Sequence, residues 1–239
     1  MNLAPLTEEK AKDGLVLLVD KPLHWTSFQA VAKLRYTLQR GLHLKKLKVG
    51  HAGTLDPLAT GLLIICVGKK TKEIDQFMGL EKEYIATLNL GATTPSYDME
   101  TEVDATFATA HITRDLLDSV LPQFTGAIEQ LPPIFSAIKQ GGVRAYEKAR
   151  AGEDVRMKAR TVHIHELEVL TFSPTQIELR ILCSKGTYIR SLAHDLGKAL
   201  DSGAYLSALR RTKIGTYSME DAKEPEQWAD ALRAAMAES

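Results

Sequence analysis

The chain has 239 residues, of which 44% are hydrophobic and 25% charged, a balance typical of folded proteins that argues against global disorder. Thirty basic and thirty acidic residues give a formal net charge of zero. Its apolar runs are far shorter than the roughly 20 residues of a membrane-spanning helix, and its first residues lack the apolar stretch of a secretory signal. We therefore expect a cytoplasmic protein in which Cys66 and Cys183 are separate buried thiols.

The zero net charge conceals three basic blocks. Residues 33–72 carry nine basic side chains and a single acidic one, Asp56. Residues 139–160 and 185–213 each carry a net charge of +4, and the compensating acids lie mainly in residues 73–135. Solvated charged faces are the simplest interpretation. The alternative is that the three blocks fold onto one face, which would attract a polyanion.

The N-terminal half is predicted to mix short strands with helices. Thr26 followed three residues later by Gln29 is a capping-box pattern that begins a helix. Apolar residues then recur at helical spacing and predict a core stripe made of Phe28, Val31, Leu34 and Leu38. The other elements expected here are strands at 14–20, 47–49, 60–67 and 83–90, helices at 71–78 and 113–121, and a polar, acidic surface loop at 93–107.

In the C-terminal half, strands return in clusters. The elements expected are a basic helix around 144–151, strands at 161–170 and 176–183 joined by a turn at Ser173-Pro174, a helix within 184–200, a short helix at 206–211, a strand at 214–217 and an amphipathic helix at 225–236. Because strands do not alternate strictly with helices, we predict the α+β class, with a mixed, mainly antiparallel sheet and flanking helices.

The domain organisation expected is a single catalytic domain over residues 1–239. Its core covers about 14–217, with an N-terminal extension at 1–13 and a helical tail at 219–239. No internal repeat, low-complexity tract or Pro/Gly-rich linker divides the sequence.

One segment between two apolar strands is dense in turn residues: Gly50-His51-Ala52-Gly53-Thr54-Leu55-Asp56-Pro57. Its glycines allow close backbone approach or positive φ, and Pro57 keeps Asp56 out of helical geometry. The segment would present one carboxylate on a rigid loop in basic surroundings, which favour its ionised form. A plain turn, in which Asp56 caps local N–H groups, is the open alternative.

A second segment, Cys183 to Arg190, leaves a strand through Gly186 and enters a helix. Tyr188 and Arg190 would lie in the first turn of that helix, where an anion is favoured. Arg190 could pair bidentately with a carboxylate. A surface arginine and a packed tyrosine are the alternative.

Motifs for metals and nucleotide cofactors are missing from the sequence. His163 and His165 share one face of a strand but have no third ligand near them, so we expect hydrogen-bonded histidines. The run Gly68-Lys69-Lys70-Thr71 lacks the upstream glycine of a phosphate-binding loop, and neither a dinucleotide-binding glycine pattern nor a nucleophile elbow occurs. We expect neither a metal nor a cofactor.

These residues carry a family resemblance. The segment from Gly50 to Leu63 resembles the signature of TruB-type tRNA pseudouridine-55 synthases, and other matching motifs follow in chain order over residues 14–217. They are Lys21-Pro22 with Thr26-Ser27, Lys82-Glu83-Tyr84, Pro132-Pro133 with Ser136-Ala137-Lys139, Arg144-Ala145-Tyr146, Cys183 to Arg190, and Leu209-Arg210-Arg211. The resemblance implies the pseudouridine synthase fold and an enzyme that isomerises uridine 55, in the tRNA T-loop, to pseudouridine.

The resemblance also implies roles for individual residues. Asp56 matches the catalytic aspartate, which is the nucleophile, and Arg190 matches the arginine that pairs with it. Tyr84 matches the tyrosine that stacks on the base and helps to deprotonate C5. The implied substrate contacts are His51 with the flipped-out RNA, Tyr188 and Leu209 with the nucleotide, Asp98 with the T-loop, and Lys21 near the site.

The chemistry of this isomerisation agrees with the motifs. The reaction breaks the N1–C1′ bond and joins C5 to C1′ without transfer of electrons, phosphate or acyl groups, so it needs no cofactor. It does need a carboxylate nucleophile in a pocket that excludes water, and a surface for the extruded base. Attack of the aspartate on C1′ and attack on C6 both stay open.

Two positions and the chain length depart from many relatives of this family. His24 stands where many have Gly, and Pro95 stands where many have an Asp that contacts the T-loop. The sequence ends about twenty residues after Tyr217, which leaves no room for the RNA-binding PUA domain of longer relatives and of guide-RNA-dependent synthases. We therefore expect a stand-alone enzyme that acts on the T-arm of tRNA without a guide RNA. We also expect a monomer that needs no obligatory protein partner and no membrane.

Two other classes of function compete with this interpretation. An RNA-binding or tRNA-folding factor would use the same basic face, but it would not need the trio of Asp56, Tyr84 and Arg190. A hydrolase of a small glycoside or nucleoside would normally need a second carboxylate beside the first. The sequence near Asp56 offers none.

Overall fold

The computed structural model describes residues 5–136, 139–140, 143–145 and 157–237. The chain divides into two compact units, Met1–Glu83 with Arg210–Ser239, and Tyr84–Leu209. Whether they act as the single catalytic domain expected from the sequence stays a prediction. No helix in the described part of the chain is long and apolar enough to cross a membrane. Most of the basic helix expected around residues 144–151 lies outside the described residues.

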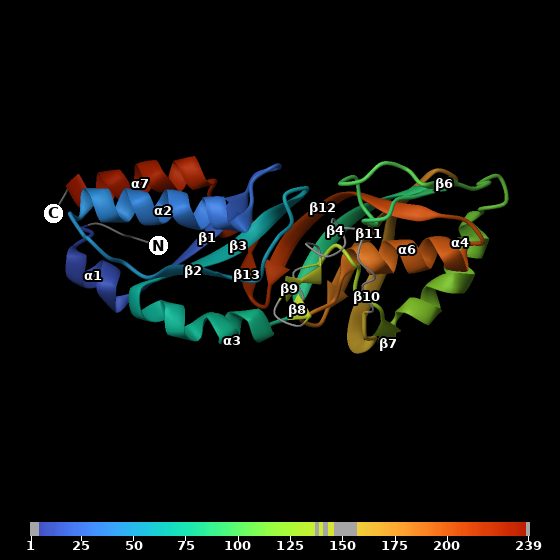
Figure 1. The fold of residues 1–239 in the computed structure, drawn as a ribbon, viewed down its shortest axis with the longest axis horizontal. Helices are drawn as coiled ribbons and strands as arrows, with labels where there is room; N and C mark the ends of the chain where they lie inside the picture. Colours follow the sequence, from blue (N-terminus) through green and yellow to red (C-terminus); the bar gives the residue numbers. More distant parts are fainter. Residues whose placement is uncertain (1–4, 137–138, 141–142, 146–156, 238–239) are drawn as a thin grey trace. The chain divides into compact units, whose positions relative to one another are not determined.

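The first unit has the strand order β1-β3-β12 (Figure 1). Strand β1 (Leu15–Lys21) is antiparallel to β3 (Ala59–Val67), and β2 (Val49–Ala52) also pairs antiparallel with β3. Strand β12 (Ala204–Ile214) contributes its residues from Arg210 onward. The other elements of this unit are α1 (Glu8–Asp13), α2 (Ser27–Gly41), η1 (Gly68–Glu73), α3 (Ile74–Gly79), β13 (Tyr217–Ser218), η3 (Met219–Asp221) and α7 (Pro225–Ala237).

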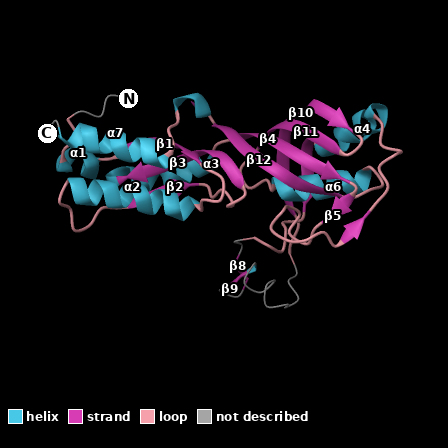
Figure 2. Cartoon of the chain, turned by 90° about the horizontal axis from the view of Figure 1, so that it is seen from above, coloured by secondary structure: helices cyan, strands magenta, loops and turns pink. Residues whose placement is uncertain are grey.

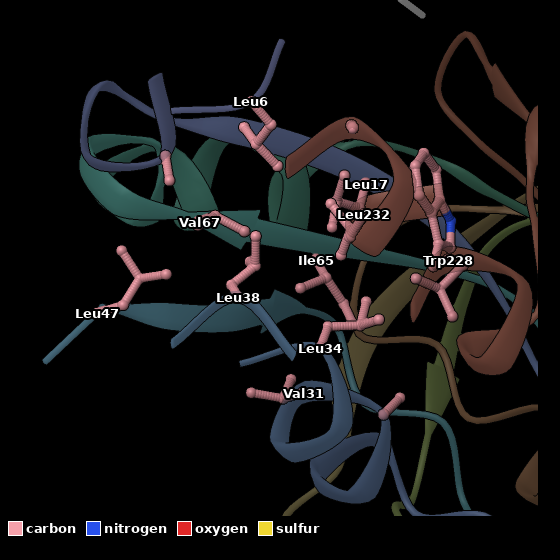
Figure 3. Close-up of a cluster of buried hydrophobic side chains, with 14 of the residues drawn as sticks. Leu6, Leu17, Val31, Leu34, Leu38, Leu47, Ile65, Val67, Trp228 and Leu232 are labelled. Carbon is pink, nitrogen blue, oxygen red and sulfur yellow. The ribbon is translucent and has the colours of Figure 1, made fainter. Parts of the chain in front are cut away.

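The core of the first unit lies where helices α2 and α7 pack beside strands β1 and β3 (Figure 3). The predicted capping box of α2 is present: the Thr26 side chain accepts a hydrogen bond from the Gln29 N–H, and the Gln29 side chain accepts one from the Thr26 N–H. The buried side chains include Leu6, Leu17, Val31, Leu34, Leu38, Ile65, Val67, Trp228 and Leu232. This packing fixes the N-terminus of α2, which leads to the candidate site.

Phe28 does not belong to this core, contrary to the sequence-based prediction: 64% of it is exposed. At about 100° per residue, Phe28 lies roughly 90° around the helix from the middle of the stripe made by Val31, Leu34 and Leu38. The spacing of three residues between Phe28 and Val31 was therefore not enough to place Phe28 in the core. Its ring lies near the guanidinium of Arg35, with 5.9 Å between Cζ and the ring centroid.

The second unit has the strand order β12-β4-β11-β10-β7. Strand β10 (Arg160–Ser173) is antiparallel to β11 (Gln176–Cys183), across the predicted turn after Ser173, and to β7 (Gly126–Gln130). Both views place helix α6 (Ile189–Ala199) beside the strands of this unit (Figures 1 and 2). Its other elements are β4 (Lys82–Leu90), β5 (Ala92–Thr93), β6 (Ala105–Thr106), α4 (Arg114–Val120), η2 (Leu121–Phe124), β8 (Lys139–Gln140) and β9 (Val143–Arg144).

The mixed order of strands and helices confirms the predicted α+β class. Cys66 and Cys183 are buried and are not bonded to each other, as predicted. The short helix expected at 206–211 is wrong, because these residues belong to strand β12. Leucine, alanine and arginine favour helices locally, but pairing with distant strands overrides that preference. The strand expected at 214–217 is interrupted by Gly215, whose φ of 54° makes the turn into β13.

Candidate active site

In the first unit, Asp56 lies on the connection between strands β2 and β3. The connection starts after the paired residues Ala52 and Ile64, and at Gly53 the backbone has a φ of 92°, which favours glycine. The carbonyl of Asp56 accepts a hydrogen bond from Ala59 N at 3.0 Å, and the carbonyl of Pro57 accepts one from His24 N at 2.8 Å. The Asp56 side chain is exposed on this fixed backbone.

Helix α2 positions the same connection through its first residue, Ser27. The Leu55 N–H donates to Ser27 Oγ at 2.9 Å, and Ser27 Oγ donates to the Leu55 carbonyl at 3.1 Å. Both residues are buried. One hydroxyl thus satisfies both backbone groups of the residue that precedes Asp56.

Arg211, on strand β12, holds the start of the connection at Gly53. Its Nε donates to the Leu62 carbonyl at 2.7 Å and its Nη2 donates to the Gly53 carbonyl at 3.0 Å, while the residue is only 2% exposed. A Cβ at Gly61 would lie 2.3 Å from the Arg211 carbonyl oxygen, so only glycine allows this approach. Arg211 belongs to one of the motifs of the family resemblance, but no role was predicted for it, because the helix expected at 206–211 concealed the alternation that turns its side chain inward.

Two further predicted residues, Lys21 and His51, lie in the same electrostatic environment. Lys21 is fully buried and donates from Nζ to the carbonyls of Trp25 at 2.6 Å and Pro22 at 2.9 Å. Burial lowers the pKa of Lys21 to about 8; Arg211 lowers it further, and the Asp56 carboxylate opposes the change. Burial, and then Arg211, also lower the pKa of His51. In the first unit, Lys21 therefore lies within electrostatic range of both Asp56 and Arg211, and His51 lies within range of Arg211.

In the second unit, Arg190 is buried in the first turn of helix α6, so the alternative of a surface arginine is wrong. Its Nη1 donates to the Ser96 carbonyl at 3.1 Å and its Nη2 to the Phe135 carbonyl at 2.9 Å. Its Nε lies 3.5 Å from Asp98 Oδ2. The Asp98 carboxylate in turn accepts hydrogen bonds from Ser96 Oγ at 2.6 Å and Glu100 N at 2.9 Å. The predicted site residues Arg190 and Asp98 therefore form one buried ion pair.

The segment that supplies Asp98 is more than the polar surface loop expected at 93–107, because Thr94, Ser96 and Asp98 are all buried. Tyr97 has a φ of 63°, and its ring stacks on His194 with 3.8 Å between the ring centroids. Burial lowers the pKa of His194 to about 4, and Lys198 adds to this effect. His194 follows Arg190 by one turn of α6, so the two side chains lie on the same face of the helix. The sequence shows this spacing, but nothing in it predicted that Tyr97 stacks on His194.

The remaining predicted residues also lie in the second unit. Tyr84 is buried on β4, and Leu209 is partly buried on β12. Tyr188 precedes α6 and is held by Gln130: its N–H donates to Gln130 Oε1 at 2.7 Å, and Gln130 Nε2 donates to its carbonyl at 3.0 Å. The guanidinium of Arg160 lies 4.6 Å from the centroid of the Tyr188 ring. Gln130 was not predicted, since its partner is distant in sequence.

Metal ligands do not gather in the part of the chain that the structure describes: no group of three or more His, Cys, Asp or Glu side chains there could hold a metal ion. The rings of His163 and His165 stack on each other at 4.5 Å.

Comparison with protein-family models decides the family. Residues 40–189 match the model of the N-terminal domain of the TruB family pseudouridylate synthases. Residues 190–238 match the model of the tRNA pseudouridylate synthase B C-terminal domain. The chain belongs to the TruB family of pseudouridylate synthases.

Individual relatives agree with this assignment. The chain is 57% identical to the tRNA pseudouridine synthase B of Phocaeicola vulgatus over 92% of its own length and 94% of the relative's. It is 55% identical to that of Flavobacterium johnsoniae, over 95% and 100% of the two lengths. The predicted family and enzymatic activity are confirmed.

Solved structures confirm the predicted pseudouridine synthase fold. A chain from the crystal structure of a Cbf5-Nop10-Gar1 complex superimposes with a TM-score of 0.69 and 28% identity. One from an H/ACA RNP bound to a substrate RNA that contains 2′-deoxyuridine gives a TM-score of 0.68 and 26% identity. Each match covers 95% of this chain but only 60% of the other chain.

The hydroxyl of Ser27 is expected to stabilise the Asp56 connection. In Ser27→Ala the buried Leu55 N–H loses its acceptor, so the free energy of unfolding in urea should fall by about 1–3 kcal/mol. Ser119→Ala is the control, since the exposed Ser119 hydroxyl donates only to Leu116 within its own helix, and it should change stability by less than about 0.5 kcal/mol. Equal effects of the two substitutions would contradict this role.

Lys21 should make stability depend on pH in the alkaline range. Its pKa in the folded chain, about 8, lies below the ordinary value of 10.5, so between these values the unfolded chain binds more protons and the free energy of unfolding rises with pH. Relative to Lys21→Met, the wild type should therefore become more stable from about pH 8 to 10 in urea denaturation. The same substitution at exposed Lys10 controls for the loss of a lysine. A constant difference between wild type and Lys21→Met would refute this assignment.

Proposed function

We propose that this enzyme converts uridine 55 in the T-loop of tRNA to pseudouridine, with Asp56 as the nucleophile. The relatives named tRNA pseudouridine synthase B, at 55–57% identity, support tRNA as the substrate. The observation that carries the proposal is the fixed connection between β2 and β3. Ser27 and Arg211 hold this connection, and it exposes the Asp56 carboxylate beside the buried cation of Lys21.

The reaction needs no group beyond the substrate and the chain. The N1–C1′ bond breaks, the uracil turns, and C5 joins C1′; the proton on C5 leaves, and N1 ends with a proton. The exposed carboxylate attacks either C1′ of the sugar or C6 of the ring, and it is released when the new bond is complete.

Tyr84 and Arg190 are assigned from the family resemblance. Tyr84 stacks on the flipped-out base and helps to remove the C5 proton, and Arg190 pairs with the Asp56 carboxylate. The contacts of Arg190 inside its own unit support a positioning role, because three acceptors fix the plane and direction of its guanidinium.

The proposed substrate contacts come from His51, Lys21, Tyr188, Leu209 and Asp98. The lowered pKa of His51 supports a neutral imidazole against the RNA at neutral pH. Asp98 is buried and bonded to Arg190, Ser96 and Glu100, which supports a part in holding Arg190. Its contact with the T-loop stays a prediction.

The enzyme is proposed to act as a cytoplasmic monomer on the T-arm, without a guide RNA or an obligatory protein partner. The curated relatives that match nearly end to end support a catalytic chain of this size. Incubation of the purified chain alone with an unmodified tRNA transcript, followed by mapping of pseudouridine, tests this proposal.

Asp56→Asn should fold and bind the tRNA transcript but make no pseudouridine, because the amide is no nucleophile. Product is measured by mapping pseudouridine after long incubation. Asp75→Asn, at an exposed aspartate in the first turn of α3, is the control and should retain wild-type turnover. Measurable turnover by Asp56→Asn would refute the role of Asp56.

Arg190→Ala should lose most activity, a fall in kcat of about 100-fold or more, and keep tRNA binding, because it orders the nucleophile rather than holding the RNA. Since the substitution leaves Asp98 buried without this partner, Arg190→Lys is measured too; it keeps the charge but loses the fork geometry and should also be slow. Arg180→Lys is the control, as that arginine pairs with Glu166 and Glu168. Near-wild-type kinetics of Arg190→Ala would overturn the assignment.

A further inference from the structure

A basic hollow lies in the first unit, where the end of α1, the end of α2 with the segment after it, and η1 meet. Its volume is about 700 Å³, and among the described residues no acidic side chain lines it. The cationic side chains that line it are Lys12, Arg35, Lys45, Lys46, Lys48, Lys69 and Lys72.

The backbone that carries the lysines of the hollow is fixed after helix α2. Leu42 N donates to the Leu38 carbonyl at 3.0 Å, and Leu44 N donates to the Gln39 carbonyl at 2.8 Å. His43 has a φ of 53°, in the left-handed region that reverses the chain at the helix end. The lysines at 45, 46 and 48 therefore project from a defined turn.

Gly68 joins this turn to the other two walls. Its N–H donates to the Lys48 carbonyl at 2.8 Å, and its φ is 60°. A Cβ at Gly68 would lie 2.3 Å from the Ala11 carbonyl oxygen and 2.4 Å from the Lys12 carbonyl oxygen. Only glycine permits this approach, so the walls of the hollow are held together by backbone contacts, independently of the lysine side chains.

The charges of the hollow are only partly balanced. Lys12 pairs with Glu8 and Lys69 with Asp13, both at the surface. Among the described residues, no ion pair is made by Lys45, Lys46, Lys48 or Lys72. Close cations repel one another, so this cluster does not stabilise the fold; it creates a local positive potential that attracts a polyanion.

The hollow is separate from the Asp56 connection. Strand β3 links them, since Asp56 precedes its first residue, Ala59, and Gly68 follows its last, Val67. Eight residue steps at about 3.3 Å make roughly 26 Å. An anion in the hollow is thus not the reacting nucleotide.

We propose that the hollow binds backbone phosphates of the substrate RNA, in a stretch roughly 25 Å from the target uridine. This inference rests on the proposed function, which supplies an RNA. Lysines spread over three segments match a row of phosphates better than one phosphate group, because each lysine acts as a separate point charge. The contact would raise affinity without reading sequence.

The test compares two triple variants with the same change in net charge. Lys45→Gln, Lys46→Gln and Lys48→Gln together remove exposed charges of the hollow. The control combines Lys10→Gln, Lys223→Gln and Arg233→Gln, at exposed positions that do not line it. The Kd for an unmodified full-length tRNA transcript is measured over a series of salt concentrations, and urea denaturation confirms that both variants fold.

We expect the hollow variant to bind tRNA at least about 10-fold more weakly, and its slope of log affinity against log salt to fall by about 2. The control should change Kd by less than about 3-fold, and Lys→Arg at the same three hollow positions should retain wild-type affinity. At saturating RNA, the single-turnover rate of the hollow variant should match the wild type.

Equal Kd and equal salt slope for the hollow variant and the control would overturn the inference, and so would a loss of affinity in the Lys→Arg variant. Pseudouridine formation by the wild type is scored in the same samples. If the wild type makes product while the hollow variant binds like the control, the inference fails and the proposed function stands. If the wild type makes no product, the proposed function fails, and the Kd comparison still decides whether the hollow binds RNA.

Discussion

The buried guanidinium of Arg211 is the contact on which the candidate site of the first unit depends. Removing a cation from water is costly, and here the Leu62 and Gly53 carbonyls offset that cost with charge-assisted hydrogen bonds. The same bonds tie strand β3 to the start of the Asp56 connection. Burial is the main cause of the lowered pKa of Lys21; Arg211 lowers this pKa further, and the Asp56 and Asp20 carboxylates oppose the change. Arg211 thus fixes the backbone of the connection and also contributes to the lowered pKa values of Lys21 and His51.

The second unit applies the same principle to Arg190. Two backbone carbonyls and the Asp98 carboxylate surround the guanidinium, and Ser96 contributes both a carbonyl to Arg190 and a hydroxyl to Asp98. The left-handed Tyr97 between them stacks on His194 of the helix that carries Arg190. A short polar segment with little regular structure is therefore ordered by a buried network rather than by a strand ladder.

Local signals explain what the sequence could predict. Continuous apolar runs predicted β1 and β3, a period-two alternation predicted β4, and helical spacing predicted α2; strands were also expected where β10 and β11 lie, and an amphipathic helix where α7 lies. The Gly and Pro residues around Asp56 predicted its loop. The errors have long-range causes: β12 is a strand because of pairing with distant strands, and residues 94–98 are buried by contacts with α6. The roles of Ser27, Gln130 and Arg211 were not predicted, because each acts on a backbone group 28 or more residues away. A single sequence does not show such pairs.

The charge pattern of residues 33–72 acquires a physical meaning in the structure. The one acid of this block, Asp56, lies beyond one end of β3, while its lysines at 45, 46, 48, 69 and 72 gather beyond the other end. A zero net charge weakens long-range attraction to a polyanion, but screening over about 8–10 Å leaves a local cluster effective. Separating these exposed lysines from the nucleophile lets one part of the unit attract phosphates at a distance from the Asp56 carboxylate. On a uniformly basic surface of the same total charge, phosphates would be drawn against Asp56, and its carboxylate would repel them.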